Sequence, residues 1–388
     1  MRIYRRELAV EIRKAAKAFG AVILTGPRRS GKTFLLRRAF PKASYHLLED
    51  PDVIGRIKAD PRGWMESVTT PAVLDEVQNV PELFAYVRSR IDGSGGRRGQ
   101  WFLTGSQDLS LMRGVTESMA GRAAVFGLLP LSFRETGSWN LVRGGFPEVV
   151  QRPRSASLWF NSYVQTYLER DVRAVKAVKN LATFRRFIAL AAARHGQILN
   201  RVDFAAPLSV SVPTVSEWLG VLETTGQIVL VPPFYENFGK RLIKSPRLYW
   251  LDSGLVCHLL RIESQRQLED SPFLGAVFEG FLASEIIKKQ INAGRARELY
   301  YFRDAQGLEV DFLVPKAAGG MHLIEAKWSR TITPEMARPL TRLRAAMKRR
   351  KTEAFIVHRT PSHGEKLGTV VPSVRALGVE EFLAGSSI

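Results

Sequence analysis

The sequence predicts an α/β protein in which a parallel sheet with crossover helices is followed by a helical middle region and a second α/β unit. Over residues 1–135, short apolar runs that suit strands alternate with amphipathic runs that suit helices, an order typical of parallel sheets. A turn-rich stretch then gives way to successive helices, and strands return near the C-terminus. Because 388 residues exceed what one ordinary core accommodates, we expect domains at 1–135, 136–260 and 261–388.

In the first unit, each expected strand is a short apolar run that ends in a turn or a helix. The expected elements are a helix over 1–20, the strand AVILT (21–25), the helix KTFLLRRAF (32–40), a helix beginning near Pro61, the strand PAVLDEVQ (71–78), the helix PELFAYVRSRI (81–91) and the strand WFLTGS (101–106). Strands separated by helices in this way pair in parallel, because each crossover helix returns the chain to the same edge of the sheet.

The middle region is expected to be helical and to end in a winged helix. Residues 155–195 include an apolar stripe at helical spacing. The segments that follow are TFRRFIALAAARHG (183–196), NRVDFAAPL (200–208) and SVPTVSEWLGVLETTG (211–226) as helices, and IVLVPPF (228–234) and RLYWLD (247–252) as strands. Three helices and a β-ribbon are typical of a winged helix.

The third of these helices contains no Lys or Arg and two Glu, so it is poorly suited to reading bases in the major groove. A better patch for contacting the DNA backbone is KRLIKSPR, which supplies Lys240, Arg241, Lys244 and Arg247. We therefore expect this region to contact DNA without sequence preference or to dock a protein.

The last unit combines one long helix with several strands. The expected elements are a helix around Glu279, the strands ELYYFR (298–303), EVDFLV (309–314) and HLIEAK (322–327), a helix from about Pro334 and the strand EAFIVH (353–358). This order predicts a second α/β fold.

The stretch GPRRSGKT fits the pattern G-x-x-x-x-G-K-[ST], with a β-branched strand before it and a helix after it. Backbone N–H groups of such a loop surround phosphates, helped by the N-terminus of the helix that follows. Lys32 would contact the β- and γ-phosphates of ATP, and the Thr33 hydroxyl would bind Mg²⁺. The expected nucleotide-binding residues are Gly26, Pro27, Arg28, Arg29, Ser30, Gly31, Lys32 and Thr33.

Polar residues at the ends of two further strands suit the hydrolysis of ATP. Asp75 and Glu76 end the run AVLDE; Asp75 would hold Mg²⁺, and Glu76 would polarise the attacking water. Ser106 ends WFLTGS and would sense the γ-phosphate. Arg122 would supply positive charge to the transition state, from the same chain or from a neighbouring subunit, or is an ordinary surface arginine.

Late in the chain, two carboxylates and an amine stand in apolar runs. Asp311 lies in EVDFLV, and Glu325 and Lys327 lie in HLIEAK. Residues i and i+2 of a strand share one face, so Glu325 and Lys327 point the same way. Because buried charges must pair or hold a metal, the group is either a metal-binding cutting site or an internal salt-bridge cluster.

Charge and cysteine content indicate partners and surroundings. A net charge of +20 favours a polyanionic partner, most simply nucleic acid. One cysteine permits no disulfide within the chain, and no apolar stretch approaches the length of about 20 residues that a membrane span needs. The basic N-terminal segment lacks the apolar core of a signal peptide. We expect a cytoplasmic protein with no membrane partner, compatible with a homo-oligomer or a protein partner.

The motifs together resemble those of prokaryotic AAA-type ATPases that carry a C-terminal domain of unknown function 4143. The resemblance rests on GPRRSGKT, VLDEVQ, LTGS, MAGR, LLPLSFRE, GGFPEV, YLERDV, RLYWLDSGL, FEGFLASEI, EVDFLV and IEAKWS, in that order, and covers nearly the whole chain. It implies a P-loop NTPase domain at the N-terminus. It also implies a C-terminal domain similar to the PD-(D/E)xK nucleases, with a restriction-endonuclease-like α/β fold.

In that nuclease fold, a helix bears a glutamate and two strands bear Asp and then Glu-x-Lys. The resemblance assigns the helix position to Glu279. It implies that Glu279, Asp311 and Glu325 bind Mg²⁺ or Mn²⁺, and that Lys327 orients a water or stabilises charge on the phosphate. Val310 stands where the motif's name has proline.

These expectations describe an ATP-hydrolysing protein that acts on DNA, in which the ATP state controls a metal-dependent nuclease-like domain. The alternative is an ATP-dependent regulatory switch whose C-terminal domain docks nucleic acid or a protein partner and cuts nothing.

Overall fold

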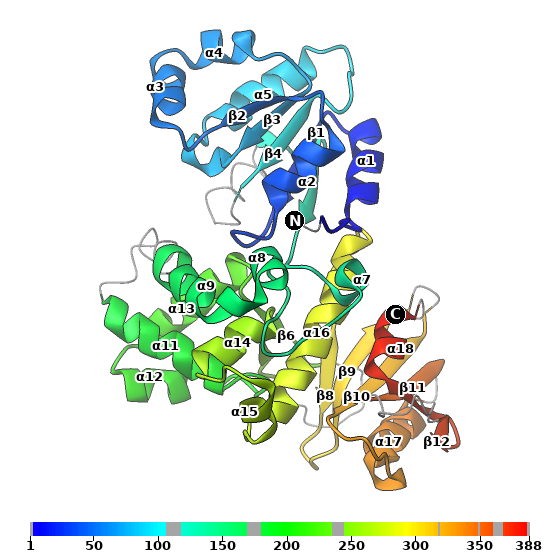
Figure 1. Cartoon of the computed structure of the whole chain (residues 1–388). Coiled ribbons are helices and arrows are strands. Elements are labelled where there is room, and N and C mark those ends of the chain that lie inside the picture. The colour runs from blue at the N-terminus through cyan, green and yellow to red at the C-terminus, as the bar shows by residue number, and fades with distance from the viewer. Residues whose placement is uncertain are drawn as a thin grey trace.

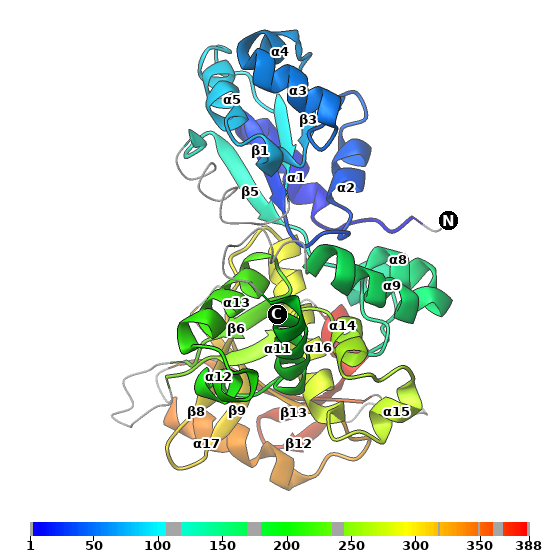
Figure 2. The ribbon, with the colours of Figure 1, turned by 90° about the vertical axis from the view of Figure 1, so that its left-hand side faces the viewer.

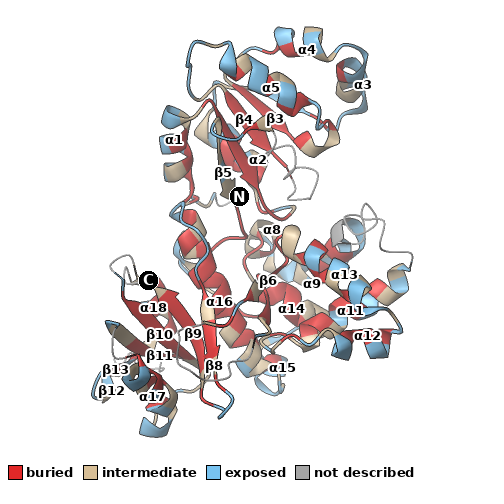
Figure 3. Ribbon diagram, turned by 180° about the vertical axis from the view of Figure 1, so that it is seen from behind, coloured by how far each residue is buried: buried red, intermediate tan, exposed pale blue. Residues whose placement is uncertain are grey.

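The computed structural model describes residues 3–105, 118–168, 180–234, 244–316, 319–347, 350–359 and 368–385. They form a parallel sheet with its helices at one end, a helical middle region and a second sheet at the other end (Figure 1). The central strands of both sheets are buried, whereas the outer faces of the surrounding helices are exposed (Figure 3). The predicted fold class is therefore confirmed. Within the described part of the chain, every helix is too short or too polar to cross a membrane.

The N-terminal sheet has five parallel strands in the order β2-β3-β4-β1-β5. Its strands are β1 (Ala21–Thr25), β2 (Ser44–Leu47), β3 (Ala72–Asp75), β4 (Trp101–Thr104) and β5 (Ala123–Gly127). Its helices are α1 (Ala9–Ala18), α2 (Lys32–Ala39), α3 (Pro51–Ala59), α4 (Pro61–Ser67), the short η1 (Val77–Asn79) and α5 (Leu83–Asp92). Because the strands are parallel, their carboxyl ends meet at one edge, where the phosphate loop also lies.

Several features of this domain differ from the sequence prediction, and one of them is strand β5, which was not expected. The expected helix over 1–20 begins only at Ala9. Strand β2 was not expected, because its residues alternate between partly buried and exposed and include a serine and a histidine. Helix α3 was also not expected, although Asp50 caps it and Pro51 occupies its first turn, which is a typical helix start.

The middle region contains the expected winged helix. The helices that lie between the two large sheets in the chain are α7 (Phe133–Thr136), α8 (Pro147–Gln151), η2 (Pro153–Ser155), α9 (Ala156–Tyr163), the π-helical turn η3 (Val164–Leu168), α11 (Leu181–Ala193), α12 (Val202–Leu208), α13 (Val212–Thr224), α14 (Ser253–Leu259) and α15 (Gln265–Glu269). Strands β6 (Ile228–Val231) and β7 (Arg247–Trp250) pair in antiparallel fashion directly after α13. Helices α11 to α13 with this ribbon form the winged helix.

The C-terminal domain is built on a mixed sheet of order β12-β13-β11-β10-β9-β8. Its elements are α16 (Leu274–Asn292), β8 (Tyr300–Arg303), β9 (Glu309–Pro315), β10 (Met321–Lys327), η4 (Pro334–Ala337), α17 (Arg338–Ala346), β11 (Thr352–His358), β12 (Thr369–Val371), β13 (Val374–Gly378) and α18 (Val379–Ala384). Strands β8, β9 and β10 form an antiparallel meander, and β11 returns through α17 to lie parallel to β10. The nuclease resemblance implied a helix followed by two strands, and α16, β9 and β10 lie in that order along the chain.

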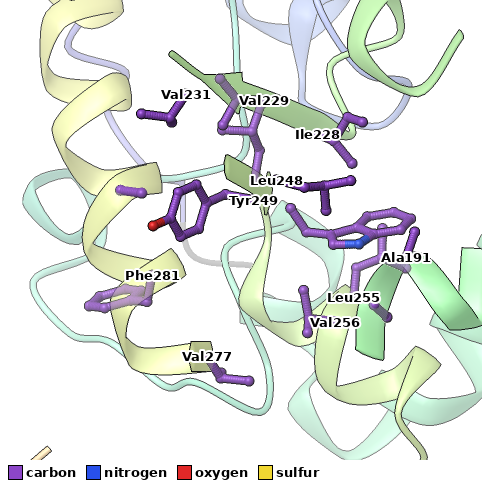
Figure 4. Close-up of a cluster of buried hydrophobic side chains, with 14 of the residues drawn as sticks. Ala191, Ile228, Val229, Val231, Leu248, Tyr249, Leu255, Val256, Val277 and Phe281 are labelled. Carbon is purple, nitrogen blue, oxygen red and sulfur yellow. The ribbon is translucent and has the colours of Figure 1, made fainter. Parts of the chain in front are cut away.

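Helix α16 joins the middle region to the C-terminal sheet. One buried hydrophobic cluster includes Phe187 of α11, Tyr249 of β7, Phe278 of α16 and Phe312 of β9, whereas the N-terminal sheet has clusters of its own. The turned view shows α16 passing behind α11 and the β6 strand (Figure 2). In close-up, Tyr249 points from β7 toward α16 (Figure 4). The middle and C-terminal regions therefore share one core.

Candidate active site

The phosphate loop has the backbone shape that its glycines predict. Gly26 and Gly31 have φ angles of 138° and 95°, in the region that favours glycine. A Cβ on Gly26 would also lie 2.3 Å from the carbonyl oxygen of Leu128. The buried Lys32 amine donates to the carbonyl oxygens of Gly26 and Pro27, both at 3.0 Å. The loop therefore curls around the amine that would contact phosphates.

Asp75, at the end of β3, receives hydrogen bonds from three hydroxyl groups. Thr33 donates to its two carboxylate oxygens at 3.0 and 2.8 Å, and Tyr45 donates to Oδ2 at 2.7 Å. Thr104, at the end of β4, donates to Oδ1. Burial, and then the bond to Asp75, raises the pKa of Tyr45. Because these donors are neutral, they leave the negative charge of Asp75 available, and Thr33 and Asp75 fit the role of Mg²⁺ ligands.

Glu76 follows Asp75 with a left-handed backbone, φ 59°. Its N–H donates to the hydroxyl oxygen of Thr104 at 3.3 Å, and its carboxylate accepts from the Gln78 amide at 2.5 Å. Glu76 lines the same cleft as Lys32 and Thr33. A carboxylate held there can polarise a water beside the terminal phosphate.

The nucleotide cleft has walls from two regions of the chain. Its volume is about 960 Å³, near the upper end of the range common for ligand pockets. The residues that line it include Arg28 to Thr33 of the loop and Glu148, Gln151, Leu158 and Trp159 of α8 and α9. Across the cleft, the Arg29 guanidinium lies 3.0 Å from the Glu148 carboxylate. A bound nucleotide would therefore contact the middle region as well as the loop.

Two further residues expected at this site are not placed there. Ser106 lies outside the described residues. Arg122 precedes β5 and pairs with Asp92 at 2.6 Å. The parallel pairing of Ala21 with Ala123 places it at the edge of the sheet opposite the phosphate loop. The structure thus does not bring Arg122 to the loop of its own chain, and a role in a neighbouring subunit remains a prediction.

The four residues of the nuclease-like motif do meet in the C-terminal domain. Glu279 comes from α16, Asp311 from β9, and Glu325 and Lys327 from β10. The Lys327 amine donates to Glu325 Oε2 at 2.8 Å, as expected for residues on one face of a strand. Asp311 Oδ2 accepts from the backbone N–H of Ala326 at 2.9 Å.

A further cation, Arg247 of β7, lies in this cluster. Its Nη1 donates to Glu279 Oε1 at 2.9 Å and lies 3.6 Å from Asp311 Oδ1, and its Nη2 donates to Glu309. The prediction that Arg247 belongs to an exposed DNA-backbone patch is therefore wrong, because the side chain is 5% exposed and ion-paired. Lys240 and Arg241 of that patch lie outside the described residues.

The pKa values of the cluster are shifted by burial and by neighbouring charge. Burial, and then Asp311, raises the pKa of Glu279 to about 7 and that of Glu325 to about 8. Burial acts to lower the pKa of Lys327, but Glu325 and Asp311 outweigh it and raise that pKa. The negative charge of carboxylates crowded in this way is offset either by a proton or by a cation beside them.

The residues expected to bind Mg²⁺ or Mn²⁺ here do not fit a metal as they are arranged. Arg247 donates to Glu279 and pairs with Asp311, and Tyr249 also donates to Glu279. The Lys327 amine donates to Glu325. These contacts occupy the oxygens that a metal would need. Among the described residues, no group of three or more His, Cys, Asp or Glu side chains could hold a metal ion. A metal step therefore has no basis in this arrangement.

The sequence prediction missed Tyr45, Thr104, Arg247 and Tyr249 as site residues. Thr104 carried a signal, because it ends a strand next to Asp75 in a parallel sheet. Arg247 carried a weaker one, as an arginine that opens the apolar strand RLYW. Tyr45 lies on β2, and no signal identified that strand.

Comparison with known proteins gives matches along almost the whole chain. The AAA domain family matches residues 18–137, and two families described as domains of unknown function, DUF8612 and DUF4143, match 139–266 and 274–374. The Mycobacterium tuberculosis protein Rv2008c and the Mycobacterium bovis protein Mb2031c are each 32% identical over 352 residues, covering 88% of this chain and 77% of theirs.

Two solved structures were also found to be similar. The Walker-type ATPase paby2304 of Pyrococcus abyssi is 14% identical with a TM-score of 0.43, over 65% of this chain and 94% of that one. The STAND protein PH0952 of Pyrococcus horikoshii is 14% identical with a TM-score of 0.23, over 72% of this chain and 47% of its own length. This chain thus spans less than half of the second protein. By its relatives and domain matches, the chain belongs to the family of AAA-type P-loop ATPases that carry a C-terminal domain of unknown function 4143.

Proposed function

We propose that the chain is an ATP-driven switch, with domains at 1–135, 136–260 and 261–388, in which the nucleotide state controls how the C-terminal half docks on nucleic acid. DNA is the favoured partner. The observation that carries the proposal is a series of buried polar contacts that runs from the phosphate loop to α16. That helix bears Glu279, so the series ends on the element that supports the carboxylate cluster.

The first contact in the series is made by Arg6, whose side chain is buried ahead of α1. Its Nη1 donates to the carbonyl oxygen of Ser30 in the phosphate loop at 2.8 Å. Its Nη2 donates to the carbonyl oxygen of Leu129 at 2.6 Å, and its Nε donates to Glu135 at 2.8 Å. Arg6 therefore links the loop to the segment that leaves the N-terminal domain.

The second contact is between that segment and α16. Glu285 accepts from the backbone N–H of Phe133 at 2.7 Å, and the Lys288 amine donates to the carbonyl oxygen of Leu131 at 3.1 Å. The two side chains also pair with each other at 2.9 Å and are buried. A shift of the loop on nucleotide exchange would thus move the segment and α16 together, since packed elements shift as units.

The chemical roles follow from the geometry of the nucleotide cleft. Lys32 would leave the loop carbonyls to contact the β- and γ-phosphates of ATP. Thr33 and Asp75 would hold Mg²⁺, which would neutralise charge on the phosphates. Glu76, steadied by Gln78, would take a proton from the attacking water. Because α8 and α9 form one wall of the cleft, the contacts of these helices with the nucleotide would change when the γ-phosphate is lost.

The proposed nucleic-acid partner rests on charge. A net charge of +20 favours contacts with phosphates over contacts with bases, and α13 offers no Lys or Arg to a groove. Binding should therefore be largely independent of sequence and fall steeply with salt. A binding constant that stays flat between low and high salt would contradict this.

The test of the switch measures DNA affinity by fluorescence anisotropy with ADP and with a non-hydrolysable ATP analogue. We expect the two affinities to differ by about 5-fold or more, as coupled sites usually do. Arg6→Met should abolish the difference, whereas Arg5→Met, at the exposed neighbouring position, should keep it. Equal affinities in the two nucleotide states of the wild type would overturn the proposal.

A second candidate is cleavage of DNA, which the meeting of Glu279, Asp311, Glu325 and Lys327 in one cluster favours and their pairing with Arg247 disfavours. Supercoiled and branched DNA, incubated with the protein and Mg²⁺ or Mn²⁺ with and without ATP, separates the two. Intact DNA supports docking without cleavage. Products that disappear with Lys327→Ala would establish a nuclease.

A further inference from the structure

The strand ribbon of the winged helix reaches into the nuclease-like cluster through the buried Arg247 and through Tyr249 of the same strand. Arg247 opens β7 in the middle region, yet its guanidinium contacts Glu279 of α16 and Glu309 and Asp311 of β9. Its side chain is 5% exposed, and its guanidinium carbon Cζ lies 4.9 Å from the centre of the Tyr301 ring. A buried arginine that contacts three carboxylates is a structural cation for all of them.

The ribbon is joined to the C-terminal sheet at the same place by backbone contacts. The N–H of Phe234 donates to the carbonyl oxygen of Tyr301 at 2.7 Å. The N–H of Tyr301 donates to the carbonyl oxygen of Pro232 at 3.2 Å. The Tyr301 hydroxyl donates to the carbonyl oxygen of Ser245 at 2.5 Å. The chain on both sides of the wing therefore lies against the edge strand β8, and Arg247 is held where it is.

The position of Arg247 conflicts with a metal in this cluster. A divalent cation such as Mg²⁺ needs several oxygen ligands at about 2 Å in an open arrangement. Here Glu279 Oε1 already accepts from Arg247 and Tyr249, and Asp311 has Arg247 beside one oxygen and the N–H of Ala326 on the other. The fixed positive charge of Arg247 would also repel a divalent cation bound to the same carboxylates.

We propose that Arg247 stands in the place of the divalent metal in this domain and locks the winged helix to the C-terminal sheet. In the folded chain, the carboxylates serve as the acceptors of this lock and take up no metal. The proposal does not depend on nucleic-acid docking, and its test contains no nucleic acid.

The test is differential scanning calorimetry of the full chain in Mn²⁺ and in EDTA. Every protein carries Lys32→Ala and is studied without nucleotide. Binding of Mn²⁺ together with nucleotide at the phosphate loop then does not contribute to the melting temperature. We expect the parent to melt at the same temperature in both buffers. A rise in Mn²⁺ that Asp311→Asn removes would overturn the proposal, because the metal would then bind with Arg247 present.

The second arm replaces the arginine. Arg247→Met should lower Tm by roughly 5–10 °C, because it leaves buried carboxylates without their cation. It should also make Tm rise in Mn²⁺, since the freed oxygens then accept a metal. Adding Glu279→Gln to Arg247→Met should recover part of the lost Tm, because it removes one of the uncompensated charges.

The matched control is Arg303→Met, which removes the other arginine that pairs with Glu309, at 3.2 Å and 41% exposed. Its Tm should stay within about 2 °C of the parent. An Arg247→Met protein that loses no more than this, or that gains no response to Mn²⁺, would overturn the proposal. If Arg247→Met does not fold, Arg247→Lys keeps the charge and should melt below the parent while still ignoring Mn²⁺; a response to Mn²⁺ there would count against the lock.

Discussion

The nucleotide site and the carboxylate cluster each bring acids and a lysine together, but their carboxylates have different partners. Asp75 is surrounded by the hydroxyl groups of Thr33, Tyr45 and Thr104 beside an open cleft. Asp311 instead is buried and lies 3.6 Å from the guanidinium of Arg247.

The contrast shows that the partners of a carboxylate decide what it can bind. Hydroxyl donors orient an acid without cancelling its charge, so the acid can still attract a cation. An arginine both orients and neutralises the acid, so the pair becomes a structural contact. The same residue types thus make a reactive site in one domain and a lock in the other.

The largest effect should come from breaking the nucleotide site. Lys32→Ala should lower ATP hydrolysis by at least about 100-fold and weaken nucleotide binding, since the phosphates lose a buried positive partner. Glu76→Gln should keep binding but lower turnover by a similar factor, because the amide cannot take a proton from water. Steady-state hydrolysis and nucleotide titration measure both, with the exposed Lys42→Ala as control. Wild-type turnover in either variant would refute the assignment.

The next effect concerns α16, which supports the cluster. A Cβ on Gly280 would lie 1.8 Å from Nε2 of the buried His195, so Gly280→Ala must force the helix away from the winged helix. We expect a loss of about 3 kcal/mol in the free energy of unfolding. Gly275→Ala on the same helix meets nothing within 4 Å and should instead stabilise by about 0.5 kcal/mol. Denaturant melts compare the two, and equal effects would contradict the packing.

Asp311→Asn tests the lock from the side of the acid. If Arg247 neutralises Asp311, the amide should cost about 2 kcal/mol, because a buried cation loses an acceptor. If the acids were instead uncompensated, removing one charge would stabilise the protein in the absence of metal. The sign of the change in Tm, measured in EDTA, decides between the two.

Much of the nucleotide site could be predicted from the sequence, because its motif lies within one loop and the ends of neighbouring parallel strands. The glycines and Lys32 are separated by few residues, and β3 fixes Asp75 beside them. Tyr45 could not be predicted, because the hydrophobic pattern of β2 is too weak to identify the strand that carries it.

Only part of the C-terminal cluster could be predicted from the sequence, because one of its members comes from a distant part of the chain. The spacing of Glu325 and Lys327 specifies a shared face, and the resemblance supplied Glu279. The local signal of Arg247 does not connect it with this cluster, because Arg247 is 32 residues from Glu279 and belongs to another region. Its position follows from the packing of the ribbon on β8, a long-range contact that no periodicity in the sequence encodes.

A smaller effect should appear on acidification, through the residue that packs on α16. Burial lowers the pKa of His195 to about 3, and its Nδ1 accepts from the N–H of Trp250. Below pH about 6.5, His195 binds a proton in the unfolded chain but not in the folded chain. The free energy of unfolding therefore falls by up to about 1.4 kcal/mol for each unit by which the pH is lowered. Denaturant melts between pH 7 and 5 measure this slope. A His195→Asn variant that keeps the full slope would show that other groups cause it.

The smallest effect tests the comparison with another arginine–glutamate pair. Arg29 and Glu148 lie 3.0 Å apart across the nucleotide cleft, but their side chains are 49% and 34% exposed, against 5% for Arg247. Solvent screens such a pair to about 0–1 kcal/mol, so Glu148→Gln should leave Tm unchanged. It should free Arg29 for the phosphates and tighten ATP binding by no more than about 5-fold, the equivalent of 1 kcal/mol. Nucleotide titration alongside calorimetry measures both. A large loss of stability would mean that this pair, like that of Arg247, is a lock, and that exposure does not separate the two sites.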